Sequence, residues 1–158
     1  MNDFPLLGVY GVNHFHYRIE DKYFKGALML NTLRHFVADD KLWFSTLKGI
    51  QADFWHSSID TEALIAYFNE KLGADLNAFF YQYLQTTDIP VLTIQKMEPQ
   101  GFKYKWSKSI ESFNLPLKLA DGKILQPATT WNTEATSSVN SQIAKELENR
   151  YLITVKWL

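Results

Sequence analysis

The stretch Ile89-Pro90-Val91-Leu92 (residues 89–92) separates two kinds of sequence, because the spacing of apolar residues changes there. Before it, apolar side chains recur at helical spacing, and after it they alternate with polar ones. A period near 3.6 is typical of an amphipathic helix, whereas a period of two is typical of a half-buried strand. The sequence therefore predicts an α+β chain of two domains, a helical part over residues 1–88 and a small antiparallel β-sandwich over residues 89–158.

The helical part is expected to contain about four helices, and their short connections make them neighbours in space. Asp39-Asp40 suits a helix start, since a carboxylate can accept the unpaired N–H groups there. Asp60 is the expected cap of a third helix, which ends at Gly73, and a fourth helix follows from Asp75. The first two helices are marked by two apolar stripes: Gly26, Met29, Leu30, Leu33, Phe36 and Val37, then Trp43, Leu47, Ile50 and Phe54.

The β part is predicted from three alternating stretches and one turn. Phe102-Lys103-Tyr104-Lys105-Trp106 alternates strictly, as do the apolar residues of 113–119 and 151–157. Asp121-Gly122 is a hairpin turn signal, because both central residues of that turn need a positive φ. The polar stretch from Thr129 to Ser141 is expected to form a loop.

Composition excludes several classes of site. The chain has 158 residues and no cysteine, so it can form neither a disulfide nor a thiolate metal site. Its formal net charge is -1, which gives no overall attraction to nucleic acid or to an anionic membrane. No apolar run approaches the roughly 20 residues of a membrane span, and residues 1–12 lack the regions of a signal peptide. Neither nucleic acid nor a membrane is therefore expected as a partner.

Three clusters of residues are candidate sites, and each has a plainer interpretation. His14 and His16 would share a face of an extended segment and with Glu20 could hold a divalent metal. Two residues at i and i+2 are a weak motif, so loop histidines are preferred. The acid pairs Glu20-Asp21 and Asp39-Asp40 are interpreted as helix-start charges rather than as a general acid and base. The lysines and aromatics of 102–108 suit a single-stranded nucleic acid, but the low net charge favours a strand with its aromatics inward.

No H-E-x-x-H, G-x-S-x-G or glycine-rich phosphate loop occurs, yet several segments resemble one peptidase family. Asp21-Lys22-Tyr23-Phe24-Lys25-Gly26-Ala27 looks like the Y-x-K-G-A segment of the aminopeptidase N family of zinc metallopeptidases (gluzincins). Tyr10-Gly11-Val12-Asn13 is similar to the Y-G-V-N segment that precedes this pattern in a bacterial branch of that family. Phe79-Phe80-Tyr81-Gln82-Tyr83-Leu84, followed by the stretch 89–92, resembles the end of its thermolysin-like catalytic domain. The resemblance covers residues 8–95.

The resemblance implies a zinc-dependent aminopeptidase that removes N-terminal residues from peptides, of which this chain would be a C-terminal fragment. The family holds its zinc through H-E-x-x-H and a further glutamate, and neither element is in this sequence. We therefore expect no metal or cofactor site in the chain, zinc and peptide substrate only in the full-length parent, and no activity from the chain alone. The one catalytic family residue on this chain is Tyr23, a hydrogen-bond donor to the substrate oxygen on which negative charge develops. Gly26, on the same helical face, would permit close packing.

The resemblance leads to two further expectations, and one alternative function remains open. Such a fragment would leave an apolar face of the helix Tyr23–Val37 uncovered, so we expect it to dimerise through that face. The resemblance implies a bacterial protein and is compatible with export to the periplasm, while the sequence itself leaves the location unknown. The alternative is a stand-alone protein-interaction or carbohydrate-binding module without catalysis. Most of the five tryptophans lie at core positions of the pattern, which favours the enzyme fragment over a sugar platform. The five are Trp43, Trp55, Trp106, Trp131 and Trp157.

Overall fold

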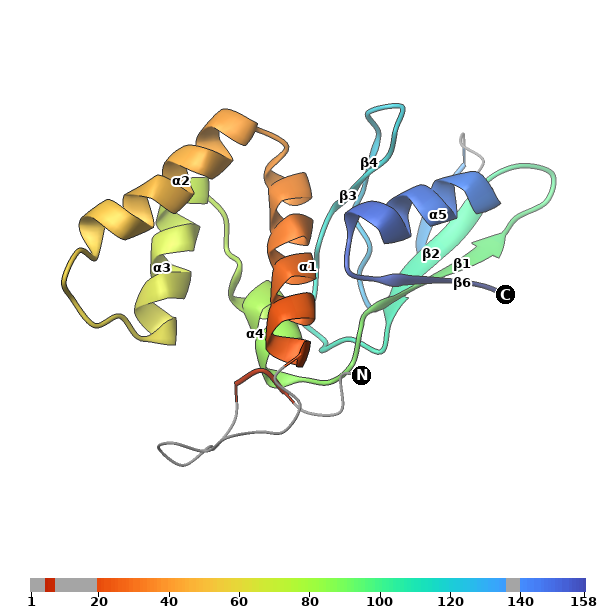
Figure 1. Cartoon of the computed structure of the whole chain (residues 1–158). Helices are drawn as coiled ribbons and strands as arrows, with labels where there is room; N and C mark the ends of the chain where they lie inside the picture. Colours follow the sequence, from red (N-terminus) through yellow and green to blue (C-terminus); the bar gives the residue numbers. More distant parts are fainter. Residues whose placement is uncertain (1–4, 8–19, 136–139) are drawn as a thin grey trace.

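The computed structural model describes residues 5–7, 20–135 and 140–158, which form an α+β fold. Four helices stand on one side of the molecule and the strands on the other, and a fifth helix lies over the strands (Figure 1). Among the described residues, no helix is both long and apolar enough to cross a membrane. The prediction of four helices before Pro90 is confirmed, although the fourth begins at Asn77 rather than at Asp75. The helices are α1 Glu20–Val37, α2 Asp40–Asp53, α3 Thr61–Leu72, α4 Asn77–Gln85 and α5 Ser141–Arg150.

Short polar residues and one glycine begin and end the helices where the sequence predicts. The Asp39 carboxylate accepts the N–H of Leu42 at 2.9 Å, and the Asp60 carboxylate accepts the N–H of Ala63 at 2.8 Å. Each bond satisfies a donor that the first turn of a helix leaves unpaired. Gly73 ends α3 with a φ of 62°, a left-handed conformation that glycine adopts without steric cost.

The strands form one mixed sheet and one hairpin, so the predicted antiparallel β-sandwich is not confirmed. The sheet has the order β5-β2-β1-β6, in which β2 is antiparallel to β1 and to β5 while β6 is parallel to β1. The separate hairpin of β3 and β4 includes Asp121-Gly122, but only Gly122 of this pair has a positive φ, of 87°, so the predicted turn with both residues at positive φ does not form. The N–H of Gly122 instead donates to the carbonyl oxygen of Leu119 at 3.0 Å. The strands are β1 Val91–Lys96, β2 Phe102–Ser107, β3 Leu117–Lys118, β4 Ile124–Leu125, β5 Asn132–Glu134 and β6 Thr154–Trp157.

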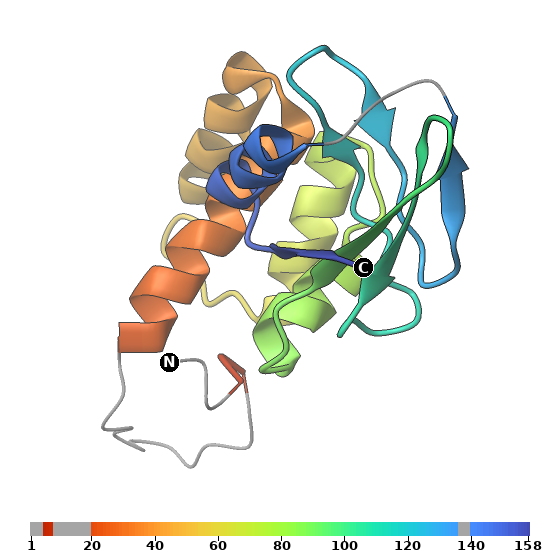
Figure 2. The same cartoon turned by 90° about the vertical axis from the view of Figure 1, so that its right-hand side faces the viewer.

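The parallel strand depends on α5, which sequence reasoning missed. Two parallel neighbours cannot be joined by a tight hairpin and usually have a helix in their connection. Here α5 precedes β6 and contacts it, so that β6 enters the sheet beside β1 in the same direction. Figure 2 shows α5 against α1, which it also contacts. The segment is mostly polar, but the Asn140 side chain caps it by accepting the N–H of Ile143 at 3.0 Å, and Ala144 and Leu147 are buried.

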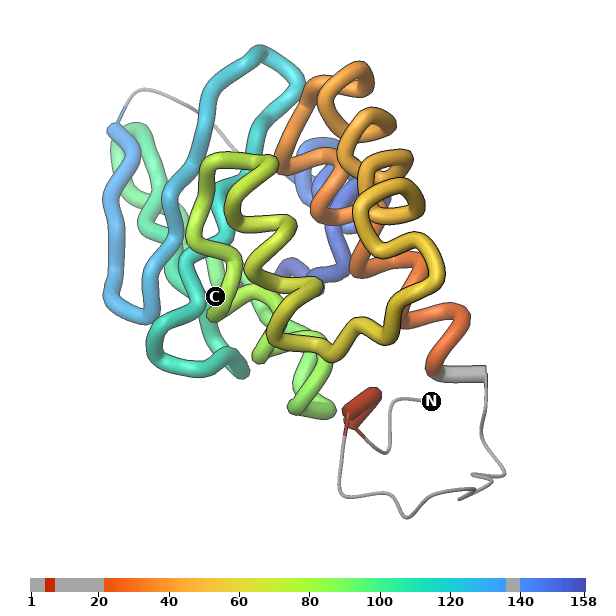
Figure 3. Tube along the Cα trace, turned by 90° about the vertical axis from the view of Figure 1, so that its left-hand side faces the viewer, coloured from red at the N-terminus to blue at the C-terminus, as the bar shows by residue number. Residues whose placement is uncertain are grey.

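One hydrophobic core joins the helical part to the sheet. Figure 3 views the molecule from the helical side, with much of the strand region at the left of the helices. α1 contacts α2, α5 and β3, and therefore lies between the other helices and the strands. The division into domains at residue 88 stays a prediction. Fully or almost fully buried members of the shared core include Leu33, Phe68, Phe80, Tyr83, Leu92, Ile94, Phe102, Trp106, Phe113, Leu117, Leu125 and Leu147.

Leu152, between α5 and β6, is hydrogen-bonded to two helices of the N-terminal part. Thr32 Oγ1 on α1 accepts the N–H of Leu152 at 2.7 Å, and Tyr83 Oη on α4 donates to the carbonyl oxygen of Leu152 at 2.8 Å. Both side chains are 0% exposed and Leu152 is half-buried, so these bonds form in a partly desolvated region, where a hydrogen bond is stronger than in water. We refer to Thr32, Tyr83 and Leu152 as the Leu152 seam. It connects residues that are 120 and 69 positions apart in the sequence.

Candidate functional site

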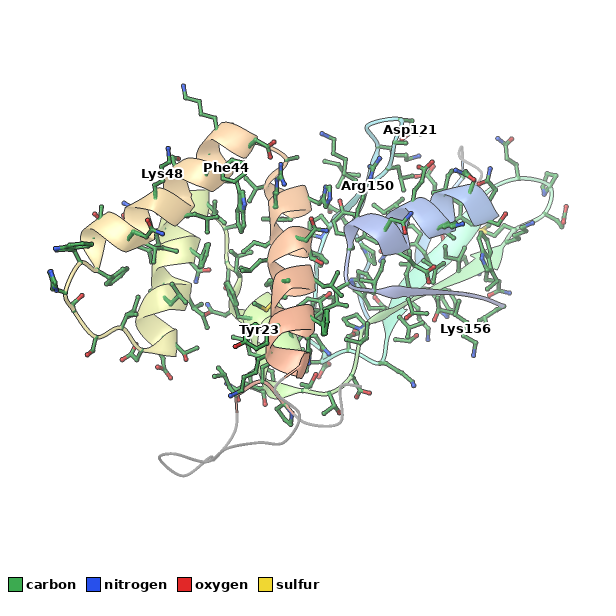
Figure 4. The ribbon with its side chains drawn as sticks, viewed as in Figure 1. Tyr23, Phe44, Lys48, Asp121, Arg150 and Lys156 are labelled. Carbon is green, nitrogen blue, oxygen red and sulfur yellow. The ribbon has the colours of Figure 1, made fainter. Side chains whose placement is uncertain are left out.

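Tyr23, the catalytic residue that the family resemblance implies, lies near the N-terminal end of α1 (Figure 4). Its side chain is 72% exposed, and that of its neighbour Phe24 is 62% exposed. The described residues therefore do not enclose the phenol. A group that contacts a substrate, or another part of a larger domain, requires this kind of exposure.

The helix that carries Tyr23 has apolar side chains on two opposite faces. Its inner face, which includes Met29 and Leu33, packs in the core. Its outer face remains exposed although it is also largely apolar. We refer to the exposed residues as the α1 outer face: Tyr23, Phe24, Ala27, Leu28 and Leu30.

Gly26, which was expected to permit close packing, has no packing neighbour among the described residues. A Cβ atom placed on Gly26 would meet no heavy atom within 4 Å beyond its chain neighbours and its own helix backbone. The described part of the chain thus leaves space beside Gly26. At helical spacing Gly26 is three residues from Tyr23 and four from Leu30, so this space adjoins the α1 outer face.

Lys25 is a buried charged residue that sequence reasoning treated only as part of a motif. It is 5% exposed, and its Nζ donates to the carbonyl oxygen of Thr86 at 2.7 Å. Burying an ammonium group is costly unless it is hydrogen-bonded. The bond links the first turns of α1 to the residue that follows α4, and so helps to position Tyr23. The available signal was helical phase, because Lys25 lies four residues before the buried Met29.

The described residues do not fit a zinc site. His14 and His16 lie outside the described residues, and so does the side chain of Glu20. Within residues 5–7, 20–135 and 140–158, no three His, Cys, Asp or Glu side chains are grouped so that they could hold a metal ion. Any zinc ion would need ligands from elsewhere.

The acid pair Asp39-Asp40 acts at a helix start, as predicted. Asp39 caps α2, and the Asp40 carboxylate accepts two hydrogen bonds from the Arg34 guanidinium, both at 2.9 Å. The hydrogen bond from Arg34 lowers the pKa of Asp40. Beside this pair, burial and then the charge of Arg150 lower the pKa of His35. These groups support the fold at the C-terminal end of α1 rather than form an acid–base pair.

The aromatic residues of β2 point inward, as the preferred interpretation of this stretch predicts. Phe102, Tyr104 and Trp106 are 1%, 7% and 1% exposed, so they offer no platform on which bases could stack. The tryptophan prediction holds only in part. Trp43 and Trp106 are buried, whereas Trp55 and Trp131 are exposed.

A cavity of about 430 Å³ lies at the other end of α1 from Tyr23. At 1.5 Å of rise per residue, Phe36 at this cavity is about 20 Å from Tyr23 along the helix axis. The cavity therefore does not form a site together with Tyr23. Its lining residues are Phe36, Val37, Ala38, Pro116, Lys118, Ile124, Gln126 and Tyr151.

Comparison with known proteins finds a likeness in structure but none in sequence. No protein-family model matches the chain, and no curated protein matches it. The fold is similar to that in the crystal structure of Legionella pneumophila aminopeptidase A in complex with aspartic acid, with a TM-score of 0.60 and 14% sequence identity. The likeness covers 85% of this chain and 17% of that one, so this chain spans less than a fifth of the length of its structural neighbour. The chain thus has a loosely aminopeptidase-like fold.

Proposed function

We propose that this chain works as part of a zinc-dependent aminopeptidase of the aminopeptidase N family, in which it completes the catalytic domain and forms the sheet after it. The observation that carries the proposal is the similarity of 85% of the chain to a segment of an aminopeptidase fold. The Y-x-K-G-A pattern at 23–27 and the F-F-x-Q-[WY]-L pattern at 79–84 also support the family, and they lie on helices α1 and α4 of this chain.

The α1 outer face supports a role inside a larger domain. Exposed apolar patches of this kind are normally covered by a partner or by another part of the same protein. In the proposed enzyme, the remainder of the catalytic domain covers Phe24, Leu28 and Leu30. The space beside Gly26 admits a closely approaching neighbour. Tyr23 then lies at the border between the two portions of the domain.

The proposed task of Tyr23 is to donate one hydrogen bond during peptide hydrolysis. Negative charge builds on the oxygen of the scissile carbonyl as the peptide bond is attacked. A phenol O–H held beside that oxygen donates to it, and the bond strengthens as the charge appears. The bond from Lys25 to Thr86 keeps the first turns of α1 in place for this contact. The proposal of zinc rests on the family resemblance alone. We assign no step at a metal to the residues of this chain.

The test is a Tyr23→Phe substitution in the full-length parent, assayed on aminoacyl substrates with metal analysis of the same samples. Loss of one donor to a developing oxyanion lowers kcat by about 100- to 1,000-fold. We expect this loss with little change in KM and an unchanged zinc content.

The matched control is Tyr81→Phe, since Tyr81 is 49% exposed on α4. It is expected to leave kcat unchanged. A Tyr23→Phe variant with the kcat of the parent would remove Tyr23 from the mechanism. A parent that hydrolyses no N-terminal residue from peptides would contradict the aminopeptidase assignment itself. The chain of 158 residues alone is expected to be inactive in the same assay.

A further inference from the structure

The outward face of the four-stranded sheet gathers lysines from two strands. Residues directly opposite each other on neighbouring strands share a face of the sheet. Thr93 of β1 lies opposite both Lys105 of β2 and Lys156 of β6, and Gln95 of β1 lies opposite Lys103 of β2. The three lysines therefore stand on one side of the sheet. Figure 4 shows Lys156 on the side of β6 that faces away from α5.

We refer to Lys103, Lys105 and Lys156, with Thr93 between them, as the lysine face. Lys103 and Lys156 are exposed and Lys105 is half-buried. The Lys105 Nζ lies 4.8 Å from the centre of the Trp131 ring, which is itself 40% exposed. From strand geometry, Lys103 and Lys105 are about 7 Å apart along β2, and Lys105 and Lys156 are about 10 Å apart across β1.

No acidic residue shares this face at the paired positions of the four strands. The sheet carries one carboxylate at its paired positions, that of Glu134 on β5. Glu134 lies opposite the buried Phe102, and so on the other face of the sheet, and it forms an ion pair with Lys123 of the hairpin region. Among the described residues, the three lysines form no ion pair. The outward positions that pair across the strands are Val91, Thr93, Gln95, Lys103, Lys105, Ser107, Thr133, Thr154 and Lys156.

The part of the chain that carries the lysine face also has an excess of basic residues. Residues 89–158 contain nine Lys and Arg against six Asp and Glu, whereas residues 1–88 contain seven against eleven. The net charge of -1 thus hides a basic C-terminal part and an acidic helical part. The lysine face therefore offers a positively charged surface to a negatively charged partner.

We propose that the lysine face binds an extended acidic segment of a partner protein. Alternate residues of an extended peptide are about 7 Å apart, which matches the spacing of Lys103 and Lys105 along β2. Trp131 lies beside Lys105 and offers an apolar contact. The half-buried Ser107 offers a hydroxyl, which is 2.9 Å from that of the buried Thr93. The charges of the segment and the face are complementary, and this complementarity identifies the partner.

Two other polyanions fit the face less well. Single-stranded nucleic acid needs several aromatic rings on which successive bases stack, and Trp131 is the one aromatic residue that we find beside the lysines in the described part. Anionic lipid surfaces are typically read by clusters of about four to eight Lys and Arg, more than the three gathered here. An acidic protein segment requires neither feature.

The experiment measures binding of a labelled synthetic peptide with Glu at alternate positions to the full chain by fluorescence anisotropy at low salt. The peptide is expected to bind, and its Gln counterpart is not. Each exposed ion pair contributes modestly, so the triple variant K103Q/K105Q/K156Q is expected to bind roughly 10-fold more weakly. Added salt should weaken binding to the unaltered chain, because exposed charges are screened.

Two further variants make the result specific. The variant K41Q/K48Q/K145Q changes the net charge equally at exposed lysines elsewhere, and it should bind like the unaltered chain. The variant K103R/K105R/K156R keeps the charges and should also bind normally. Equal loss in both Gln variants, no binding to the unaltered chain, or tighter binding of an oligonucleotide or of anionic vesicles than of the peptide would each overturn the proposal.

Discussion

Replacing Tyr83 by phenylalanine tests whether the Leu152 seam stabilises the helical part and the sheet as one unit. The substitution removes only the hydroxyl that donates to the carbonyl oxygen of Leu152 at 2.8 Å. The ring stays in the core, where it packs edge-to-face against Phe79 and Phe113. Burial raises the pKa of Tyr83, so the hydroxyl remains a donor throughout the accessible pH range.

The expected destabilisation comes from losing this bond and leaving a carbonyl oxygen without it. A typical intramolecular hydrogen bond contributes about 1 kcal/mol, and an unsatisfied buried partner costs about 1–3 kcal/mol. Because Tyr83 is 0% exposed, we expect the free energy of unfolding to fall by about 2 kcal/mol. For a chain of this size, that corresponds to a fall in Tm of about 4–8 °C.

The assay is thermal and urea unfolding followed by circular dichroism and by tryptophan fluorescence. Tryptophans lie in both parts, including Trp43 on α2 and Trp106 on β2. A single transition shared by circular dichroism and fluorescence would therefore show that the two parts unfold together. The matched control is Tyr81→Phe, which alters an exposed tyrosine of the same helix and should change stability by less than about 0.5 kcal/mol. A Tyr83→Phe variant as stable as this control would refute the reasoning.

Three other outcomes are expected. The Tyr23→Phe parent enzyme loses kcat while retaining its zinc, as steady-state kinetics and metal analysis would show; unchanged kcat is the contrary result. We further propose that the chain by itself forms a dimer through the α1 outer face. Analytical ultracentrifugation should then find that Leu30→Glu gives a monomer while Leu42→Glu, at a site of the same 37% exposure, does not; a monomeric unaltered chain would contradict this. Because the folded-state pKa of His35 lies below its ordinary value of 6.5, the unfolded chain binds more protons just below pH 6.5 and stability falls as the pH drops through that window. His35→Gln should flatten this part of the stability profile, and an unchanged slope would exclude His35 as its source.

Local features of the fold follow from the sequence because they depend on neighbouring residues. The helix caps at Asp39 and Asp60 need only a carboxylate within three residues of an unpaired N–H. The left-handed turn at Gly73 needs only the missing Cβ. The inward aromatics of β2 follow from alternation, since successive strand residues point to opposite faces.

The candidate site was predictable only through resemblance and only in part. A tyrosine at a helix start has no chemical signature of its own, so Tyr23 became a candidate through the Y-x-K-G-A pattern. Its exposure and the uncovered apolar side of α1 depend on the tertiary structure. The burial of Lys25 was not predicted, because lysine is mostly exposed in proteins, whereas here its Nζ reaches the Thr86 carbonyl oxygen.

Strand partners and long-range bonds could not be predicted from the sequence, because many pairings satisfy the same alternation. The local sequence does not specify that β6 pairs with β1 in parallel, or that a mostly polar segment forms α5. The lysine face likewise exists only once β2 and β6 share a sheet. Backbone hydrogen bonding is satisfied by any neighbouring strand, so burial of one common core by α1, α4, α5 and the sheet selects the arrangement.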